Sequence, residues 1–261
     1  MGCCVSTNAN SSANRVTRWR STGIVALRDA KLKEFPNEIL QVESIRTLDL
    51  TNNKIALIPP EISRLNHIQR LVLANNIIQS LPINIGDLRT LKSLTLDGNQ
   101  ITYLPNELGS LPRLEKISIS RNSLISLPKT IGDLRNLVLL NVSQNKLKSL
   151  PESIGGCVAL EELQANENSI DDLPLSICKL VHLKSLLLNN NNICQLPPNL
   201  LKECRALQNI SLHANPISMD QFQQMDGFEE FESRRKKKFD KQIDSNVMMS
   251  STALDEGLDL R

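Results

Sequence analysis

The sequence predicts an α/β solenoid in which nine repeats stack into a horseshoe with a parallel β-sheet on its concave side. Three observations predict it. One pattern of leucines, an asparagine and a proline recurs about every 23 residues over 24–217. Hydrophobic residues make up 40% of the chain but aromatic residues only 3%. Aliphatic and polar residues also alternate at the start of each repeat. A core of aliphatic side chains is typical of repeats that stack one layer on the next.

The strand of each repeat is marked by two aliphatic residues that lie two positions apart. Leu48 and Leu50 form one such pair, and Leu71 and Leu73 form the next. An alternation of period two places both side chains on the inner face of a short strand. One strand per repeat predicts a parallel sheet whose neighbouring strands lie about 4.8 Å apart.

An asparagine follows each strand and is expected to belong to a structural ladder. The turn out of a strand leaves backbone N–H and C=O groups without partners in the sheet. A side-chain amide can satisfy both kinds of group. Ala30 takes this position in the first repeat, which is therefore expected to be an atypical capping unit. The ladder residues are Asn53, Asn76, Asn99, Asn122, Asn145, Asn168, Asn191 and Asn215.

The second half of each repeat predicts a convex side that is irregular, 3-10 or helical. A Leu-Pro pair such as Leu81-Pro82 begins it, because proline fixes φ and opens a new segment. An aliphatic residue such as Ile85 then returns the segment to the core.

The chain ends differ in composition from the repeats. We expect residues 1–22 to be a disordered tail and residues 23–217 to form the repeat domain. Residues 218–239 are expected to form an amphipathic helical cap with a basic end, and residues 240–261 a second disordered tail. A solenoid needs such a cap to cover its last layer. The cap prediction rests on apolar residues at spacings of three, namely Phe222, Met225, Phe228 and Phe231.

The N-terminus carries the motif that most directly suggests a location. Gly2 follows the initiator methionine and Ser6 stands at the sixth position, which fits the N-myristoylation pattern. Cys3 and Cys4 lie beside it as candidates for palmitoylation, and the tail to residue 22 contains arginines but no acid. One myristoyl chain binds a membrane only marginally, so a second signal is needed for stable anchoring. We therefore expect a cytoplasmic protein held peripherally on the plasma membrane or an endomembrane.

Several other functional classes are disfavoured. The net charge is only +2, no apolar run approaches the roughly 18 residues of a membrane span, and no secretory leader is evident. No catalytic constellation is found, and no metal site or cofactor is expected, so the chain is predicted not to be an enzyme. The six cysteines fit neither a zinc pattern nor a disulfide framework, which favours a reducing compartment.

One basic run, from Arg234 to Lys238, leaves alternatives open. It could face lipid, act as a nuclear signal or contact RNA. We favour a solvated helix end, where cations are placed well near a helix C-terminus. Without aromatic platforms beside it, nucleic-acid binding is not expected.

The binding hypothesis concerns the strand residues that point out of the concave face. Nothing in the fold requires apolar residues there, so Val72, Leu139 and Leu187 are candidates for contact with a partner, although single exposed aliphatics are common on surfaces. Charged neighbours would complete a mixed surface suited to a protein partner. The full candidate set is Arg70, Val72, Lys116, Arg121, Leu139, Glu162 and Leu187.

The repeat resembles a known family. Leu91 to Leu111 reads L-x-x-L-x-L-x-x-N-x-I-x-x-L-P-x-x-L-G-x-L, which is similar to the Ras-group leucine-rich-repeat class, including the plant intracellular Ras-group proteins. Residues 22–36 and 227–239 also resemble the leucine-rich-repeat-containing protein fifty-seven family. The plant class carries a Gly-Val-Tyr-Trp motif after its repeats, and this chain does not. A Ras-pathway role therefore rests on analogy of fold.

Taken together, the sequence predicts a monomeric, lipid-anchored adaptor that binds a protein on its concave face. The resemblance implies intracellular signalling, with small GTPases or kinases as partner classes. The alternative is a soluble cytosolic regulator that binds and inhibits an enzyme and uses no lipid anchor.

Overall fold

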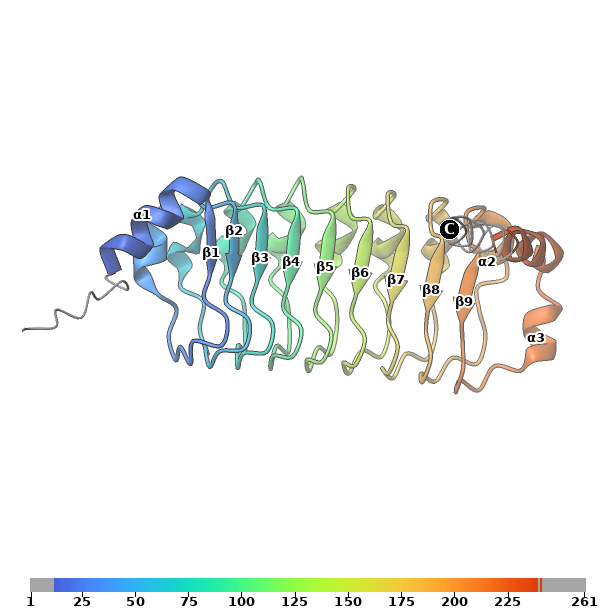
Figure 1. Ribbon diagram of the computed structural model, residues 1–261. Coiled ribbons are helices and arrows are strands. Elements are labelled where there is room, and N and C mark those ends of the chain that lie inside the picture. Colours follow the sequence, from blue (N-terminus) through green and yellow to red (C-terminus); the bar gives the residue numbers. More distant parts are fainter. Residues whose placement is uncertain (1–11, 239, 241–261) are drawn as a thin grey trace, which may run out of the picture.

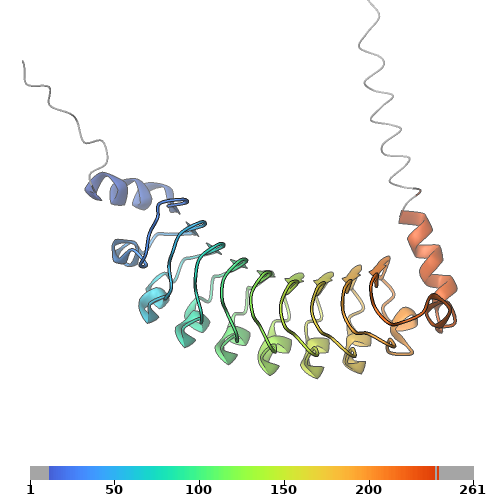
Figure 2. The same cartoon turned by 90° about the horizontal axis from the view of Figure 1, so that it is seen from below.

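The computed structural model describes residues 12–238 and residue 240, and it forms a curved solenoid (Figures 1 and 2). Nine parallel strands make one sheet in sequence order, so the predicted sheet of nine repeats is confirmed. The register advances by one repeat at each step, with Leu48 opposite Leu71 and Leu71 opposite Leu94. The strands are β1 (Ile24–Ala26), β2 (Thr47–Asp49), β3 (Arg70–Val72), β4 (Ser93–Thr95), β5 (Lys116–Ser118), β6 (Leu139–Asn141), β7 (Glu162–Gln164), β8 (Ser185–Leu187) and β9 (Asn209–Ser211).

Short helical turns form the outer side of the arc, and the strands line its inner side (Figure 2). Each 3-10 turn follows an extended proline. Pro105, for example, has φ −68° and ψ 148°, and its carbonyl accepts a hydrogen bond from the N–H of Leu108 at 3.2 Å. The turns are η1 (Asn37–Gln41), η2 (Pro60–Arg64), η3 (Ile83–Asp87), η4 (Asn106–Ser110), η5 (Lys129–Asp133), η6 (Glu152–Gly156), η7 (Leu175–Lys179) and the α-helical α2 (Leu200–Glu203).

The core is a stack of aliphatic layers between the sheet and the turns. In the fourth repeat, Leu94, Leu96, Ile101 and Leu108 are all fully buried. Burial of one such side chain contributes roughly 1.5–3 kcal/mol. Because each layer contacts only its two neighbours, this contribution recurs along the solenoid.

The ladder asparagines join each repeat to the one before it. Asn76 donates from Nδ2 to the carbonyl oxygens of Leu50 and Leu73, at 3.0 and 3.1 Å. Its Oδ1 accepts from the N–H of Ile55 at 3.0 Å. The other seven asparagines make the same three contacts. Each amide therefore ties together the backbone of two consecutive repeats.

The N-terminal end differs from the expectation. Residues 12–22 were expected to belong to a disordered tail, but Ser12–Thr22 forms helix α1, so that boundary is wrong. Trp19 is only 5% exposed, and its carbonyl accepts from the N–H of Gly23 at 2.8 Å. Arg15 lies 6.0 Å from the Trp19 ring centroid and pairs with Glu38 at 3.3 Å. Helix α1 therefore covers the open β1 end of the sheet (Figure 1).

The C-terminal cap is helical, as predicted, but it is built from two helices. The first is α3 (Met219–Gln223), which a capping box at Ser218 begins, and residues 228–238 form the second. Gly227 separates them at φ +85°, where an added Cβ would lie 2.7 Å from the backbone nitrogen of Lys202. The Phe222 ring packs edge-on against Phe228 and Phe231, at centroid distances of 5.5 and 5.9 Å. Residues 241–261 lie outside the described part.

Candidate protein-binding site

Three candidate residues form one continuous row across the concave face. Lys116 of β5 lies opposite Leu139 of β6, which lies opposite Glu162 of β7. Lys116 is exposed, and Leu139 and Glu162 are half-buried. We call these three residues the central row. It presents a cation, an aliphatic group and a carboxylate side by side on a rigid sheet.

The other candidates do not gather around the central row. Arg70 is in the same register line but is separated from Lys116 by Ser93. Val72 and Leu187 belong to the line at the third strand residue, on β3 and β8, with four strands between them. The surface inferred from the sequence therefore divides into separate parts.

Val72 is covered, and Arg121 already bonds to another side chain, as Glu162 does by accepting from Nε2 of Gln164 at 2.6 Å. Val72 is only 8% exposed, so the expectation that it offers a contact surface is wrong. Arg121 lies in the turn after β5 at φ 54° and donates from Nε to Oε1 of Gln144 at 2.9 Å. Gln144 in turn donates to Glu167 at 2.9 Å. Arg121 is thus the first of three hydrogen-bonded side chains that lie just after the C-terminal ends of β5, β6 and β7.

An ion pair at the first two repeats was not predicted from the sequence. Asp49 is 5% exposed, and Nε and Nη2 of Arg28 each lie 2.6 Å from its Oδ2. Thr51 donates to Oδ1 from its hydroxyl at 2.6 Å and from its N–H at 3.0 Å. Burial by itself raises the pKa of Asp49, but the hydrogen bonds from Thr51 and Arg28 and the Arg28 charge outweigh it. The pKa of Asp49 therefore lies below its ordinary value of 3.8.

Further polar networks fix other parts of the concave face. Oδ1 of Asp97 accepts from the hydroxyls of Ser118 and Ser120 at 2.7 and 2.8 Å, and from the N–H of Ser120 at 2.6 Å. Oδ1 of Asn189 accepts from the Ser211 hydroxyl and the His213 N–H at 2.7 and 2.8 Å. Because these side chains are already ordered, a partner that contacts them loses less side-chain entropy on binding.

The buried thiols are poorly suited to chemistry. Burial raises the pKa of Cys157 and of Cys204 to about 12, so both are protonated at neutral pH. The Cys157 Sγ also lies 3.1 Å from the Ile131 carbonyl oxygen. Within residues 12–238, no group of three or more His, Cys, Asp or Glu side chains could hold a metal ion.

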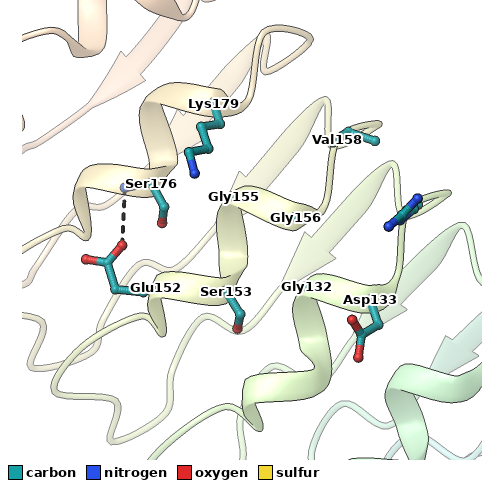
Figure 3. Close-up of a pocket in the computed structure, with 10 residues that line it drawn as sticks. Gly132, Asp133, Glu152, Ser153, Gly155, Gly156, Val158, Ser176 and Lys179 are labelled. Atoms are coloured by element: carbon teal, nitrogen blue, oxygen red, sulfur yellow. Dashed lines mark hydrogen bonds between the residues drawn. The ribbon is translucent and has the colours of Figure 1, made fainter.

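The convex side contains a recess of about 470 Å³ across η5, η6 and η7 (Figure 3). Gly132, Gly155 and Gly156 line it together with Asp133 and Lys179, which end η5 and η7. The buried hydroxyls of Ser153 and Ser176 have no hydrogen-bond partner among the described residues. With charges of both signs at its rim, the recess indicates no particular ligand.

The proposed lipid-attachment residues Gly2, Cys3 and Cys4 lie outside the described residues. From residue 12 to residue 238, no helix is both long enough and apolar enough to cross a bilayer.

Comparisons with known proteins agree with this geometry. A family model described as a leucine-rich repeat region matches residues 79–165, and two leucine-rich-repeat models match residues 43–101 and 182–204. Plant intracellular Ras-group-related LRR protein 7 of Oryza sativa subsp. japonica is 77% identical over 261 residues, which is 100% of both chains. The chain belongs to the plant intracellular Ras-group-related LRR family. The predicted resemblance to the Ras-group class is confirmed, and the finer resemblance to the protein fifty-seven family stays a prediction.

Solved structures share the solenoid fold. An LRR protein of Leptospira interrogans superposes with a TM-score of 0.71 at 35% identity, over 74% of this chain and 49% of that one. The plant peptide hormone receptor RGFR1, solved in complex with RGF2, gives 0.63 at 27% identity, over 75% of this chain and 32% of the receptor. The chain thus spans half or less of these solved relatives. The three family models that match all describe leucine-rich repeats.

Proposed function

We propose that this chain is a non-enzymatic adaptor that binds a partner protein on its concave face in intracellular signalling. The central row of Lys116, Leu139 and Glu162 carries the proposal, because it joins apolar and charged groups on adjacent strands. The name of the rice relative supports a Ras-group setting. The partner class that we propose is a small GTPase or a kinase.

The physical basis is a preformed surface. An interface gains affinity when its contact residues are held in place before binding. A partner with an acidic group opposite Lys116, a basic group opposite Glu162 and an apolar side chain over Leu139 would match the central row. Such complementarity contributes to specificity as well as to affinity.

A charge-altering double variant tests the concave face. We would compare Leu139→Arg/Glu162→Lys with wild type by proximity labelling in plant cells. The control is Val158→Arg/Glu152→Lys, which makes the same charge change on exposed convex residues. The concave variant is expected to lose protein neighbours that wild type and the control retain. Identical neighbour sets for all three proteins would contradict the assignment of the concave face.

The second part of the proposal is a lipid anchor on the cytoplasmic face of a membrane. Gly2 would carry myristate and Cys3 and Cys4 would carry palmitate, which together supply the two signals that stable anchoring requires. A single myristoyl chain binds with an association constant of only about 10⁴ M⁻¹. Helix α1 would then join the anchor to the β1 end of the sheet.

Metabolic labelling with a clickable myristate analogue tests the anchor. Wild type and the control Val5→Ala are expected to incorporate the label and to fractionate with membranes, while Gly2→Ala does neither. Cys3→Ser/Cys4→Ser should keep the label but bind membranes weakly. An unlabelled, soluble wild-type protein would contradict the anchor and favour a soluble cytosolic regulator that binds and inhibits an enzyme.

A further inference from the structure

The last layer of the solenoid is only partly covered on its strand side. No strand follows β9 in the described sheet. Ile210 and Leu212 of this final repeat are half-buried, whereas the equivalent Leu186 and Leu188 are fully buried. Apolar surface that the preceding repeat buries against its successor therefore remains accessible here.

The same edge offers backbone donors that lack a strand to bind. The N–H groups of Leu188 and Asn190 each donate at 2.8 Å, to the carbonyl oxygens of Ser211 and His213. The corresponding groups one repeat later belong to Leu212 and Ala214, and no strand of the described chain stands opposite them. An open strand edge of this kind is a template for an added strand.

The C-terminal helices leave this edge free because they are fixed elsewhere. Arg234 donates from Nη2 to the Leu201 carbonyl at 2.8 Å and from Nε to the Leu207 carbonyl at 3.0 Å. Lys202 of α2 pairs with Asp226 at 2.9 Å. These contacts hold the cap against the α2 side of the last repeat, while α3 stands beyond β9 (Figure 1).

A groove of about 430 Å³ lies between β9 and the cap. Its lining is largely apolar, and Met219 at its rim is 68% exposed. Arg235 also lines the groove, and the exposed Lys236 and Lys237 follow it on the same helix. Its apolar lining residues include Leu212, Ala214, Ile217, Met219, Phe222 and Phe231.

We propose that this groove binds an extended peptide segment of another protein, added beside β9 as a tenth strand. The unpaired N–H groups of Leu212 and Ala214 favour an extended peptide, because the backbone carbonyls of such a peptide could accept hydrogen bonds from them. Alternate apolar side chains of the segment would enter the groove. Acidic residues between or beside them would face Arg235, the basic side chain that lines the groove and that also pairs with Glu232 at 3.0 Å. The occupant is thus an acidic peptide with apolar residues at every second position.

Peptides of defined pattern test the chemistry. The probe is a fluorescein-labelled peptide of alternating Val and Asp, titrated with the full chain and followed by fluorescence anisotropy. Two further peptides carry N-methyl groups on every Val amide or on every Asp amide. An added strand forms hydrogen bonds along one side only, so one methylated form should bind at least about tenfold more weakly while the other still binds. A peptide of alternating Val and Lys, which carries the opposite charge, should also bind at least about tenfold more weakly. Equal binding of all the peptides would overturn the proposal.

A matched pair of protein variants locates the site. Met219→Glu places a charge at the groove, and Leu175→Glu makes a similar change at a convex residue that is 69% exposed. Because both side chains are exposed, both variants should fold. The Val-Asp peptide is expected to bind Met219→Glu about tenfold more weakly and Leu175→Glu like wild type. Equal affinity for the two variants would overturn the proposal.

Two other occupants give distinct outcomes. A full chain that is dimeric by light scattering, and monomeric as Met219→Glu, would show that a second copy fills the groove. The chain also ends in an alternating Leu258-Asp259-Leu260. Peptide binding that appears only in full-length Leu258→Ser/Leu260→Ser would show that the chain's own segment competes for the groove. Either outcome would overturn the proposal of a partner segment, whereas a monomer that binds the peptide without these changes supports it.

Discussion

The guanidinium of Arg28 holds the carboxylate of Asp49 across the first two repeats, with two nitrogens 2.6 Å from the same oxygen. Thr51 occupies the other carboxylate oxygen. Asp49 is therefore a charged group that is almost completely covered and yet fully partnered. Removing its charge should expose how much this arrangement stabilises the N-terminal end of the solenoid.

Asp49→Asn is expected to lower the free energy of unfolding by about 1–3 kcal/mol at neutral pH, because charge-assisted hydrogen bonds to Arg28 and Thr51 are weakened. The pKa of Asp49 is lowered in the folded chain, so its contribution is present above the ordinary value of 3.8 and is lost as pH falls through the lower folded pKa. Urea unfolding at neutral pH and near pH 3 measures the change. The difference between wild type and variant should shrink at the lower pH.

The control for this variant is Asp87→Asn, which alters an exposed carboxylate on η3. It should change stability by less than about 0.5 kcal/mol at either pH. A difference for Asp49→Asn that stays constant from pH 7 to pH 3 would contradict the link to the carboxylate charge.

The Arg28–Asp49 pair also shows where sequence reasoning fails. Asp49 is the last residue of β2, and Arg28 lies two residues after the end of β1, so the two residues hold different positions in their repeats. The pair is offset by 21 positions, while the register compares residues 23 apart. Contacts between residues at different positions of the repeat depend on side-chain length and rotamer, and a repeat pattern contains neither. Val72 is likewise covered although its position points outward.

Other features follow from periodicity alone. Lys116, Leu139 and Glu162 hold the same position in three successive repeats, and the register of the parallel sheet places them side by side. Helix α1 could not be found in this way, because Val16 and Trp19 are its only large apolar residues in a polar segment. Helix α1 could be anticipated only from the assembled fold, in which the open end of the sheet has to be covered.

The asparagine ladder predicts unequal costs along the chain. Asn99→Ala should lower the free energy of unfolding by about 3 kcal/mol, because the Ile78 N–H and the Leu73 and Leu96 carbonyls lose a buried partner. Asn215→Ala should cost less, since Asn215 is half-buried and lies at the end of the ladder. Urea denaturation of the two variants measures the difference. Equal losses would contradict the dependence on burial.

The close contact between convex turns predicts a second sensitive position. A Cβ added at Gly86 would lie 2.6 Å from the carbonyl oxygen of Glu107 and 2.9 Å from its Cβ, so the two turns would have to separate. Gly86→Ala is expected to destabilise the chain by about 1–3 kcal/mol. Asp87→Ala changes the next, exposed residue and should be nearly neutral. A thermal melt of both variants checks the contrast, and a stabilised Gly86→Ala protein would contradict it.

Helix α1 predicts that the first repeats depend on one side chain. Trp19 is 5% exposed and lies in the same core cluster as Val25 and Phe35. Trp19→Ala removes a large buried group and should cost about 3–5 kcal/mol at that end.

In a solenoid each repeat is stabilised mainly by its neighbours, so this loss should stay local to the end of the stack. Hydrogen exchange measures it. The N–H of Leu27, which donates to the Asp49 carbonyl at 2.8 Å, should exchange faster in Trp19→Ala than in wild type. The N–H of Leu188, which holds the equivalent position near the other end of the sheet, should exchange at an unchanged rate. Arg18→Ala, which alters an exposed residue of the same helix, should leave both rates as they are. Faster exchange at Leu188 as well would mean that the solenoid unfolds as one unit, and the cap would then stabilise every repeat equally.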